Sequence, residues 1–471
     1  MSKKIFTKDH KFNADIYTPV ELYLSLRHSY RKACLMESND YHSRQDSKSF
    51  IGFEPIVELK LEGYKLTEIV NGEKSIIEFS KEEPISEQVQ ARLNSFQFSD
   101  EFGAQSGFFG RIGFEFSLMN ESQINKKPSQ LGIPDLHLFV YKYILIIDHF
   151  NDTGLMLKND FIDQPINEKE VNAILIKRPF ASFPFETTGK EKSDFTDEEF
   201  TELVSQSKRH LERGDVFQLV LSNRYQTSFF GDDFEVYRSL RRLNPSPYLF
   251  YFDFEDYHLF GSSPEAQLKI ENGEAEIHPI AGTMVKTGDP AVDEANIQFL
   301  INDEKENAEH TMLVDLARND LSRSCSDVKV DSYKEIQAFS HVYHIVSIVK
   351  AQLIDRFKSF TTFSQTFPAG TLSGTPKPKA LELISKYEKT TRDFYGGSVG
   401  MLAANGDVNM AIVIRSILSK DGKLVYRAGA GVVLDSQPDK ECQEVHNKLR
   451  AVRVAIEEAQ KGMQKPKLAL L

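Results

Sequence analysis

The sequence predicts an α+β fold in which most strands pair antiparallel. Two observations support this prediction. The second half of the 471-residue chain alternates long helical stretches with short segments rich in β-branched residues. Successive strand-like segments in that half, such as 398–403 and 411–418, are joined by connections too short for the helical crossover that parallel strands require. A parallel, doubly wound sheet is therefore disfavoured.

Composition and charge narrow the class of protein. The chain carries 57 Lys and Arg against 69 Asp and Glu, a formal net charge of −12, which disfavours binding to nucleic acid because such binding needs a basic face. Hydrophobic residues make up 40% of the chain, enough for a full core, and no apolar run is long enough to span a membrane. The N-terminus lacks the apolar region of a secretory signal, and the three cysteines are widely spaced. We expect a soluble cytoplasmic protein.

The first part of the chain is expected to be rich in strands. Segments 51–61 and 136–147 have the β-branched and aromatic content typical of strands. The polar stretch 186–194 shows no apolar period and is the expected linker. The sequence therefore predicts an N-terminal domain, 1–185, and a second domain, 186–465.

Capping and periodicity predict the elements of the second domain. Thr196 and Glu199 form a capping-box pattern, which indicates a helix that ends near residue 213. Apolar residues at helical spacing predict two further long helices, over 302–322 and 439–463. Strands are expected at 216–222, 398–403, 411–418 and 424–433.

Each of the two long helices carries a Glu-x-x-Glu motif, Glu306 with Glu309 and Glu441 with Glu444. A spacing of three residues puts both carboxylates of a pair on one helix face. If the two faces meet, up to four carboxylates gather, and a hard cation such as Mg²⁺ would neutralise them. The alternative is a solvated acidic face, which carboxylate spacing alone does not exclude.

Three further features allow both a functional and a structural interpretation. Segment 367–379, with Thr375 before Pro376, predicts a helix N-terminus that suits a carboxylate or phosphate, or simply a capped loop. Arg415 lies in an apolar strand, where it would bind a planar carboxylate or face outward. His344 lies in an apolar stretch and could act as acid or base, although the local pattern favours a core histidine.

Five segments taken together are more specific than any one of them. They occur in order along the chain, at 279–283, 303–320, 370–374, 395–400 and 428–436. With these segments the sequence closely resembles the chorismate-utilising enzymes and, within that family, the anthranilate synthase component I branch. The resemblance is strong over about 190–460. It implies two antiparallel β-sheets packed as a sandwich with helices outside, and it makes 186–465 the chorismate-binding catalytic domain.

The resemblance implies a Mg²⁺-dependent lyase that converts chorismate and ammonia to anthranilate and pyruvate, the first step of tryptophan biosynthesis. By matched position, Glu309 and Glu444 resemble the metal ligands, with Glu306 and Glu441 holding the ion through water. Glu265 resembles the general acid that protonates the departing C4 hydroxyl, which needs a carboxyl kept protonated by its surroundings. The other matched positions are the catalytic residues His344 and Thr283 and the substrate-binding residues Gly282, Thr371, Tyr395, Arg415, Gly429, Gly431 and Lys448.

Two positions distinguish this chain from neighbouring branches of the family. Aminodeoxychorismate synthase component I usually carries Lys where this chain has Ala281, and a methyl group cannot attack the ring covalently. Isochorismate and salicylate synthases carry a water-activating Lys where this chain has Gln218, and a neutral amide cannot serve as that base. Both positions favour direct attack by ammonia. Two alternatives stay open: the aminodeoxychorismate branch, and a catalytically silent protein that binds chorismate or an amino acid.

The resemblance also implies a partner and an inhibitor. No glutaminase motif surrounds Cys34, Cys325 or Cys442, so ammonia is expected from a separate glutamine amidotransferase subunit, component II, in a heterodimer or heterotetramer. Feedback inhibition by tryptophan is expected in the N-terminal domain. The positions that match the inhibitor pocket are Glu37, Ser38, Asn244, Pro245, Ser246, Pro247, Tyr248 and Leu249. An ordinary proline turn is the alternative for residues 244–247.

Overall fold

The computed structural model describes residues 3–38, 47–120, 124, 126–176, 183–338 and 342–461. Its helices are α1 (Pro19–Arg27), α2 (Ile85–Leu93), α3 (Glu168–Leu175), α4 (Asp197–Glu212), α5 (Phe234–Leu243), α6 (Pro290–Asn302), α7 (Glu304–Ser322), α8 (Ser359–Thr366), α9 (Gly370–Ser373), α10 (Lys377–Tyr387) and α11 (Pro438–Lys461).

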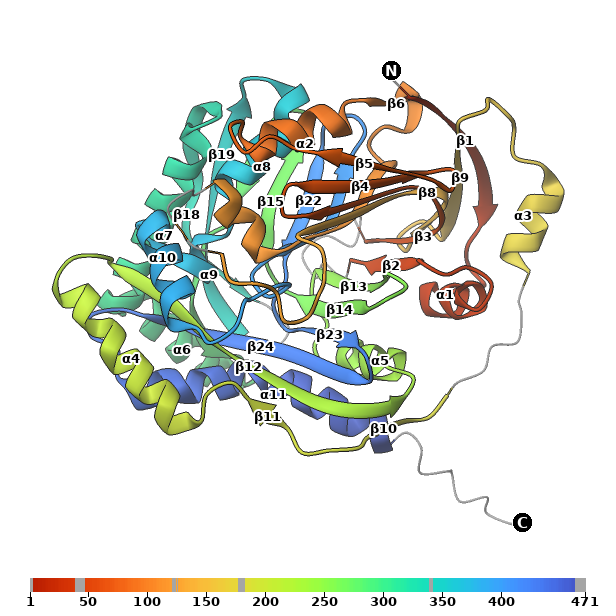
Figure 1. Ribbon diagram of the computed structural model, residues 1–471. Helices are drawn as coiled ribbons and strands as arrows, with labels where there is room; N and C mark the ends of the chain where they lie inside the picture. Colours follow the sequence, from red (N-terminus) through yellow and green to blue (C-terminus); the bar gives the residue numbers. More distant parts are fainter. Residues whose placement is uncertain are drawn as a thin grey trace, which may run out of the picture.

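The strands are β1 (Lys3–Asn13), β2 (Cys34–Glu37), β3 (Lys48–Glu62), β4 (Lys65–Val70), β5 (Glu73–Glu78), β6 (Phe96–Phe98), β7 (Gly107–Ile112), β8 (Leu136–Asp148), β9 (Thr153–Asp160), β10 (Phe185–Thr187), β11 (Lys192–Ser193), β12 (Gln218–Gly231), β13 (Tyr248–Asp253), β14 (His258–Ser263), β15 (Ala266–Glu271), β16 (Glu274–Ile277), β17 (Ile280–Val285), β18 (Cys325–Ala338), β19 (Val342–Leu353), β20 (Gly374–Thr375), β21 (Ser398–Ala403), β22 (Val408–Ile412), β23 (Ser416–Lys420) and β24 (Lys423–Val432). Helices lie on the outside of the molecule, with α2 and α8 at the top of Figure 1 and α4 and α11 at the bottom.

The prediction of antiparallel pairing is confirmed, but the strands form one connected sheet that branches into two arms. Both arms contain the long pair β3 and β8, and they extend from it in different directions. The first arm runs in the order β9, β8, β3, β2, β13, β14, β23, β24, β12. The second runs in the order β4, β3, β8, β7, β21, β22, β15, β16, β19, β18. The register of β3 against β8 shifts between Pro55 and Val57, beside Glu54 with a φ of 57°, and this bulge separates the arms.

Apolar residues fill three main cores around this branched sheet. One core takes residues from both arms, including Phe250 and Leu418 of the first and Phe109 and Met401 of the second. A second core lies between the first arm and helices α4, α5, α10 and α11. The third lies between the second arm and helices α2, α7 and α8. Strands thus form the centre of the molecule, and helices cover both outer faces.

Most predicted elements lie close to their expected bounds. The capping box of Thr196 and Glu199 is present and opens α4. The helix expected over 302–322 begins at Glu304, because Asp303 caps its N-terminus and separates it from α6. Two expectations were wrong. Thr375 lies in β20 and caps no helix, since Pro376 occupies the N-cap position of α10.

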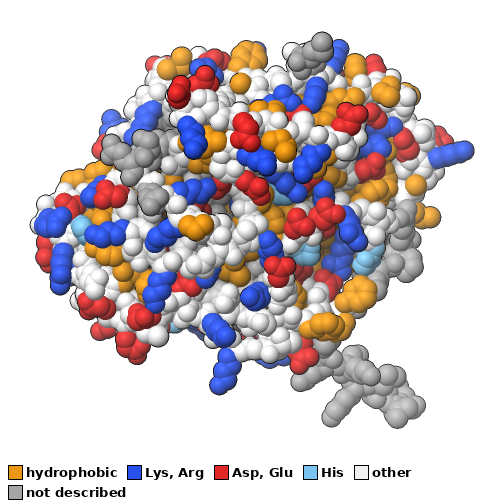
Figure 2. Space-filling model, in the orientation of Figure 1, with side chains coloured by type: hydrophobic (Ala, Val, Ile, Leu, Met, Phe, Trp, Pro, Cys, Tyr) orange, Lys and Arg blue, Asp and Glu red, His pale blue; other side chains and the backbone are white. Residues whose placement is uncertain are grey.

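The strand expected at 411–418 is the second correction, and it concerns a predicted site residue. The structure divides this segment between β22 and β23, and Arg415 lies in the break between them. Its φ of 50° is left-handed, a conformation that cannot continue a strand. Among the described residues, no helix is long and apolar enough to cross a membrane. On the face drawn in Figure 2, acidic and basic side chains are interspersed rather than gathered by sign.

Candidate active site

Contacts between separate elements bring the predicted catalytic and substrate-binding residues into one site. Thr371 of α9 contacts Glu265, which lies between β14 and β15. His344 of β19 contacts Gly282 of β17. Lys448 of α11 donates to the carbonyl oxygen of Gly429 in β24 at 2.9 Å. Electrostatic interactions join these pairs, since Arg415 acts on both Glu265 and His344, and Glu444 acts on Glu306, Glu309 and Tyr395. Of Thr283, only the backbone, in β17, is described.

Glu265 has the properties of an acid that is half protonated near neutral pH. Burial raises the pKa of its carboxyl to about 7, against the hydrogen bond from Thr371 and the positive charges of Lys448 and Arg415. The Thr371 hydroxyl donates to Glu265 Oε1 at 3.0 Å. The second carboxyl oxygen is therefore left for a proton. Such a group can donate a proton to a leaving oxygen.

His344 is held in a fixed orientation by the backbone. Its Nδ1 lies 2.6 Å from the carbonyl oxygen of Gly282, so Nδ1 carries the hydrogen and donates it. Burial lowers the pKa of the imidazole, and the charge of Arg415 acts in the same direction. A neutral imidazole of this tautomer keeps the lone pair on Nε2, which can accept a proton.

The position of Gly282 has no room for a side chain. Its φ of 62° is left-handed, and a Cβ atom would lie 2.6 Å from Leu300 Cδ1 and 3.5 Å from Glu306 Oε2. The glycine therefore lets strand β17 approach α6 and α7 closely, which brings the carbonyl that orients His344 next to the carboxylates of α7.

The four glutamates of α7 and α11 act on one another, as the paired motifs predict. Burial, with the neighbouring charges of Glu306, Glu441 and Glu444, raises the pKa of Glu309 to about 7 against the opposing charge of Lys305. Burial and the charge of Glu444 raise the pKa of Glu441 as well. The two acidic helix faces therefore lie within electrostatic range of each other, which favours one shared cluster over two separate solvated faces.

The donor set of this cluster fits a hard divalent cation. All its candidate ligands are carboxylate oxygens, which Mg²⁺ prefers. Glu441 is buried, and its Oε2 atom has no hydrogen-bond partner within the described part of the chain. Lys448 lies 2.6 Å from Glu444 Oε1 and Lys305 lies 3.7 Å from Glu309 Oε1. These two lysines partly offset the negative charge.

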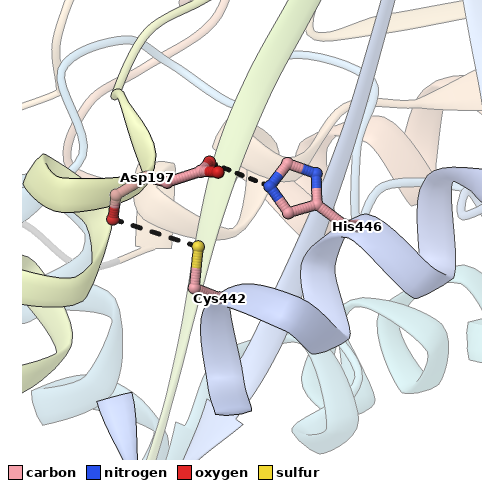
Figure 3. Close-up of side chains that lie close together, drawn as sticks. All are labelled: Asp197, Cys442 and His446. Atoms are coloured by element: carbon pink, nitrogen blue, oxygen red, sulfur yellow. Dashed lines mark hydrogen bonds and ion pairs between the residues drawn. The ribbon is translucent and has the colours of Figure 1, made fainter. Parts of the chain in front are cut away.

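A second group of potential metal ligands joins Cys442 and His446 of α11 to Asp197 at the start of α4 (Figure 3). Asp197, Cys442 and His446 are the one set in the described ranges whose ligand atoms all lie within 4.8 Å of one another, so the glutamates are more widely spread. Arg453 Nη1 donates to His446 Nδ1 at 3.0 Å, so the ring hydrogen is on Nε2, which donates to Asp197 Oδ1 at 2.8 Å. Neither nitrogen has a lone pair left for a metal. We interpret this group as a structural link between α4 and α11.

Arg415 and Tyr395 are the predicted site residues that carry a cation and a phenolic hydroxyl. Burial lowers the pKa of Arg415, which the charge of Glu265 opposes. No hydrogen bond or ion pair of its guanidinium is found with the residues the structure describes, so its donors are available to an anion. The Tyr395 hydroxyl lies 3.1 Å from where a Cβ atom on Gly429 would stand. A side chain at Gly429 would therefore displace this hydroxyl.

The predicted inhibitor positions also come together. Strand β2 pairs with β13, which places Glu37 opposite Leu249. The buried Glu37 carboxylate accepts from the Tyr237 hydroxyl at 2.7 Å and from two nitrogens of Arg241 at 2.7 Å each. Asn244 Nδ2 donates to Ser262 Oγ at 3.1 Å. Segments 200 residues apart in the sequence thus line one region, as an inhibitor pocket at these positions requires.

Sequence reasoning missed a buried charge cluster behind the site. Arg392, Glu388 and Arg427 are 2%, 2% and 3% exposed. Arg392 and Arg427 both donate to Glu388. The one available signal is the position of Arg392, three residues before Tyr395, in a polar segment that no periodic pattern explains.

Comparisons with known proteins agree with this geometry. The family model of the chorismate-binding enzymes matches residues 31–454. Anthranilate synthase component 1 of Neisseria meningitidis serogroup C is 36% identical over 469 residues, which cover 96% of this chain and 95% of the relative. The protein of the same name from Aquifex aeolicus is 33% identical over 467 residues, with coverage of 96% and 94%.

Solved structures show the same relationship. The crystal structure of anthranilate synthase component I from Streptococcus pneumoniae superposes with a TM-score of 0.77 at 30% identity, covering 93% of this chain and 98% of that one. The menaquinone-specific isochorismate synthase of Escherichia coli gives a TM-score of 0.75 at 18% identity, with coverage of 97% and 95%, and shares the fold. The chain therefore belongs to the chorismate-binding enzymes and, within that family, to the anthranilate synthase component 1 proteins.

Proposed function

We propose that this chain converts chorismate and ammonia to anthranilate, pyruvate and water with Mg²⁺. The observation that carries the proposal is Glu265, whose carboxyl has a pKa of about 7 and accepts a hydrogen bond from Thr371 in the site that also holds His344. Relatives that carry the name anthranilate synthase component 1 over the full length support it. The family's covalent and water-activating branches need a lysine at positions that are Ala281 and Gln218 in this chain.

The first half of the reaction uses Glu265 as the acid. Ammonia forms a bond to C2 of the ring, and its nitrogen then releases one proton to solvent, while the bond from C4 to its hydroxyl breaks. Glu265 donates its proton to the departing oxygen, which leaves as water. The Thr371 hydroxyl on Oε1 holds the carboxyl so that the protonated oxygen faces the ring.

The second half uses His344 as the base. Its Nε2 atom removes the proton from C2, because Nδ1 is already committed to the carbonyl oxygen of Gly282. The electron pair forms the aromatic ring as the bond from C3 to the enolpyruvyl oxygen breaks. The enolpyruvate takes up a proton and becomes pyruvate.

The two carboxylates of chorismate are bound at opposite ends of the site. Arg415 and the Tyr395 hydroxyl hold the enolpyruvyl carboxylate, while Lys448 and the backbone of Gly282 and Gly431 line the ring-carboxylate end. Gly429, which accepts from Lys448 and lies beside the Tyr395 hydroxyl, stands between the two ends. Glu309 and Glu444 would hold Mg²⁺ directly, and Glu306 and Glu441 would hold it through water. When bound, the ion supplies Lewis-acid polarisation of the ring carboxylate.

The surroundings of the reaction are part of the proposal. The two arms of the sheet, packed on a shared core, are the layers of the expected sandwich. Segment 1–185 contributes Glu37 and Ser38 to the inhibitor pocket, and segment 186–465 contributes residues 244–249 of that pocket together with the catalytic machinery. The buried, unpaired thiols suit the cytoplasm. A glutamine amidotransferase subunit supplies the ammonia.

The direct test is an assay of the purified chain with chorismate and Mg²⁺, followed by the fluorescence of anthranilate. We expect product with ammonium and none with glutamine, because a separate subunit releases ammonia from glutamine. EDTA should abolish the product. A non-aromatic amino product would place the chain in the aminodeoxychorismate branch, and unchanged chorismate under all conditions would make it a silent binding protein.

Tryptophan is expected to inhibit, and Asn244→Ala should weaken inhibition. Loss of one hydrogen bond to the inhibitor corresponds to about a tenfold rise in the tryptophan concentration for half inhibition. The curve is measured at fixed ammonium and saturating chorismate. Asn151→Ala is the matched control, because Asn151 lies in an exposed turn and bonds Asp148. Identical inhibition curves for the two variants would remove residues 244–249 from the inhibitor pocket.

A further inference from the structure

The buried charge cluster behind the site connects the elements that carry its functional groups. The Arg392 guanidinium donates to both oxygens of Glu388, at 3.0 Å to Oε2 and 3.2 Å to Oε1 from Nε. It also donates from Nη1 to the carbonyl oxygen of Leu372 and from Nη2 to that of Val220, the latter at 2.8 Å. One side chain thus uses its rigid fork of donors on three separate elements.

Each backbone contact of Arg392 leads directly to a predicted site residue. Leu372 follows Thr371 in the short helix α9. Val220 of β12 pairs in the ladder with Gly431 of β24. The guanidinium also packs on two aromatic rings, with its central carbon 4.5 Å from the centre of Phe114 and 5.7 Å from the centre of Tyr395.

Arg427 provides an internal comparison. It is equally buried and donates to Glu388 Oε2 at 2.7 Å. Its remaining hydrogen bonds go to Ser222 Oγ, Thr390 Oγ1 and the carbonyl oxygen of Thr391. None of these groups is on α9. The two arginines therefore share a partner and a degree of burial but differ in whether they contact α9 and the ring of Tyr395.

We propose that Arg392 is a positioning residue for the reaction, which holds Thr371 on Glu265 and the ring of Tyr395 in the site. The inference rests on the proposed function. A salt bridge this deeply buried is weak evidence of stabilisation, because desolvation opposes the attraction of the charges. The contribution that we propose for Arg392 is the orientation of its neighbours. A short helix of four residues cannot fix its own orientation, and the carbonyl of Leu372 ties it to the sheet through Arg392.

The test compares Arg392→Lys with Arg427→Lys in steady-state assays with chorismate and ammonium. Lysine keeps the charge and loses the fork. For Arg392→Lys we expect kcat/KM to fall about 100-fold, as a displacement of about 1 Å produces, with a raised KM because Tyr395 is displaced. The basic limb of the pH profile should move to higher pH. The hydrogen bond from Thr371 lowers the pKa of Glu265, so its loss keeps Glu265 protonated up to a higher pH. The charges of Lys448 and Arg415 still act on Glu265 in the variant.

Arg427→Lys should leave the basic limb in place. Equal losses of kcat/KM in both variants, with the basic limb of the pH profile unchanged, would overturn the proposal and make Arg392 purely structural. If Arg392→Lys does not fold by circular dichroism, Phe114→Leu replaces it, because this change loosens the guanidinium without deleting a charge. An unchanged KM and limb in Phe114→Leu would then count against the proposal.

Failure of the proposed function is separable from failure of this inference. A parent chain that forms no anthranilate refutes the function. Chorismate binding to the parent, Arg392→Lys and Arg427→Lys can then be measured by calorimetry with Mg²⁺. Weaker binding in the first variant alone would still support the positioning role, and equal binding in all three would refute it.

Discussion

Glu265→Gln is expected to lower kcat for anthranilate formation by about 10²- to 10⁴-fold, with KM for chorismate nearly unchanged. Glutamine has the same shape and keeps an oxygen that accepts from Thr371, so the substrate site should stay intact. It has no acidic proton for the departing C4 hydroxyl. A loss of kcat at constant KM is the signature of an interaction made in the transition state.

The pH profile gives the same prediction an independent readout. In the parent, kcat should fall as pH rises through about 7, because the reaction needs the protonated carboxyl, which is lost above that pKa. In Glu265→Gln the basic limb at about 7 should vanish from the small residual rate. Glu271→Gln is the control, since Glu271 ends the strand that directly follows Glu265, β15, in an exposed position. Parent-like activity in Glu265→Gln would assign the acid to another group.

Local elements and the functional motifs of this chain could be predicted from its sequence, because they depend on short-range chemistry. The capping box of α4 and the start of β21 lie where the pattern indicated. The meeting of the Glu-x-x-Glu faces could be stated only as a condition, because which faces of two distant helices meet is a tertiary property. In the structure the charges of Glu441 and Glu444 act on Glu309, so the two faces lie within electrostatic range of each other.

What the sequence could not predict depends on long-range geometry. The branching of the sheet follows from a bulge at Glu54 and Pro55, inside a segment whose apolar content reads as one uninterrupted strand. Arg415 interrupts a run of β-branched residues, and propensity alone favours a continuous strand there. Arg392 carries no motif, because its guanidinium contacts two backbone carbonyls, those of Leu372 and Val220, in segments that are distant from it in the sequence.

Removal of one carboxylate from the acidic cluster is expected to lower the activity and to raise the stability of the metal-free protein. Glu309→Gln should reduce Mg²⁺-dependent activity by about 10³-fold, as loss of a metal ligand and its electrostatic stabilisation would. In EDTA, the melting temperature of the same variant should be about 2 °C higher than that of the parent. The substitution removes one of four mutually repelling carboxylates, which raises the free energy of unfolding by about 1 kcal/mol. Added Mg²⁺ should raise the melting temperature of the parent and not that of the variant.

The control distinguishes this cluster from an ordinary acidic helix face. Glu202→Gln removes a carboxylate from the same i, i+3 spacing on α4, where Glu202 is exposed and Gln206 donates to it at 2.9 Å. Surface charges in solvent interact weakly, so neither activity nor the response to Mg²⁺ should change. If Glu309→Gln lowered the melting temperature in EDTA, the carboxylates would be held by protein contacts rather than waiting for a cation. The metal would then have to bind elsewhere, because a site preorganised for Mg²⁺ must be destabilised when the ion is withdrawn.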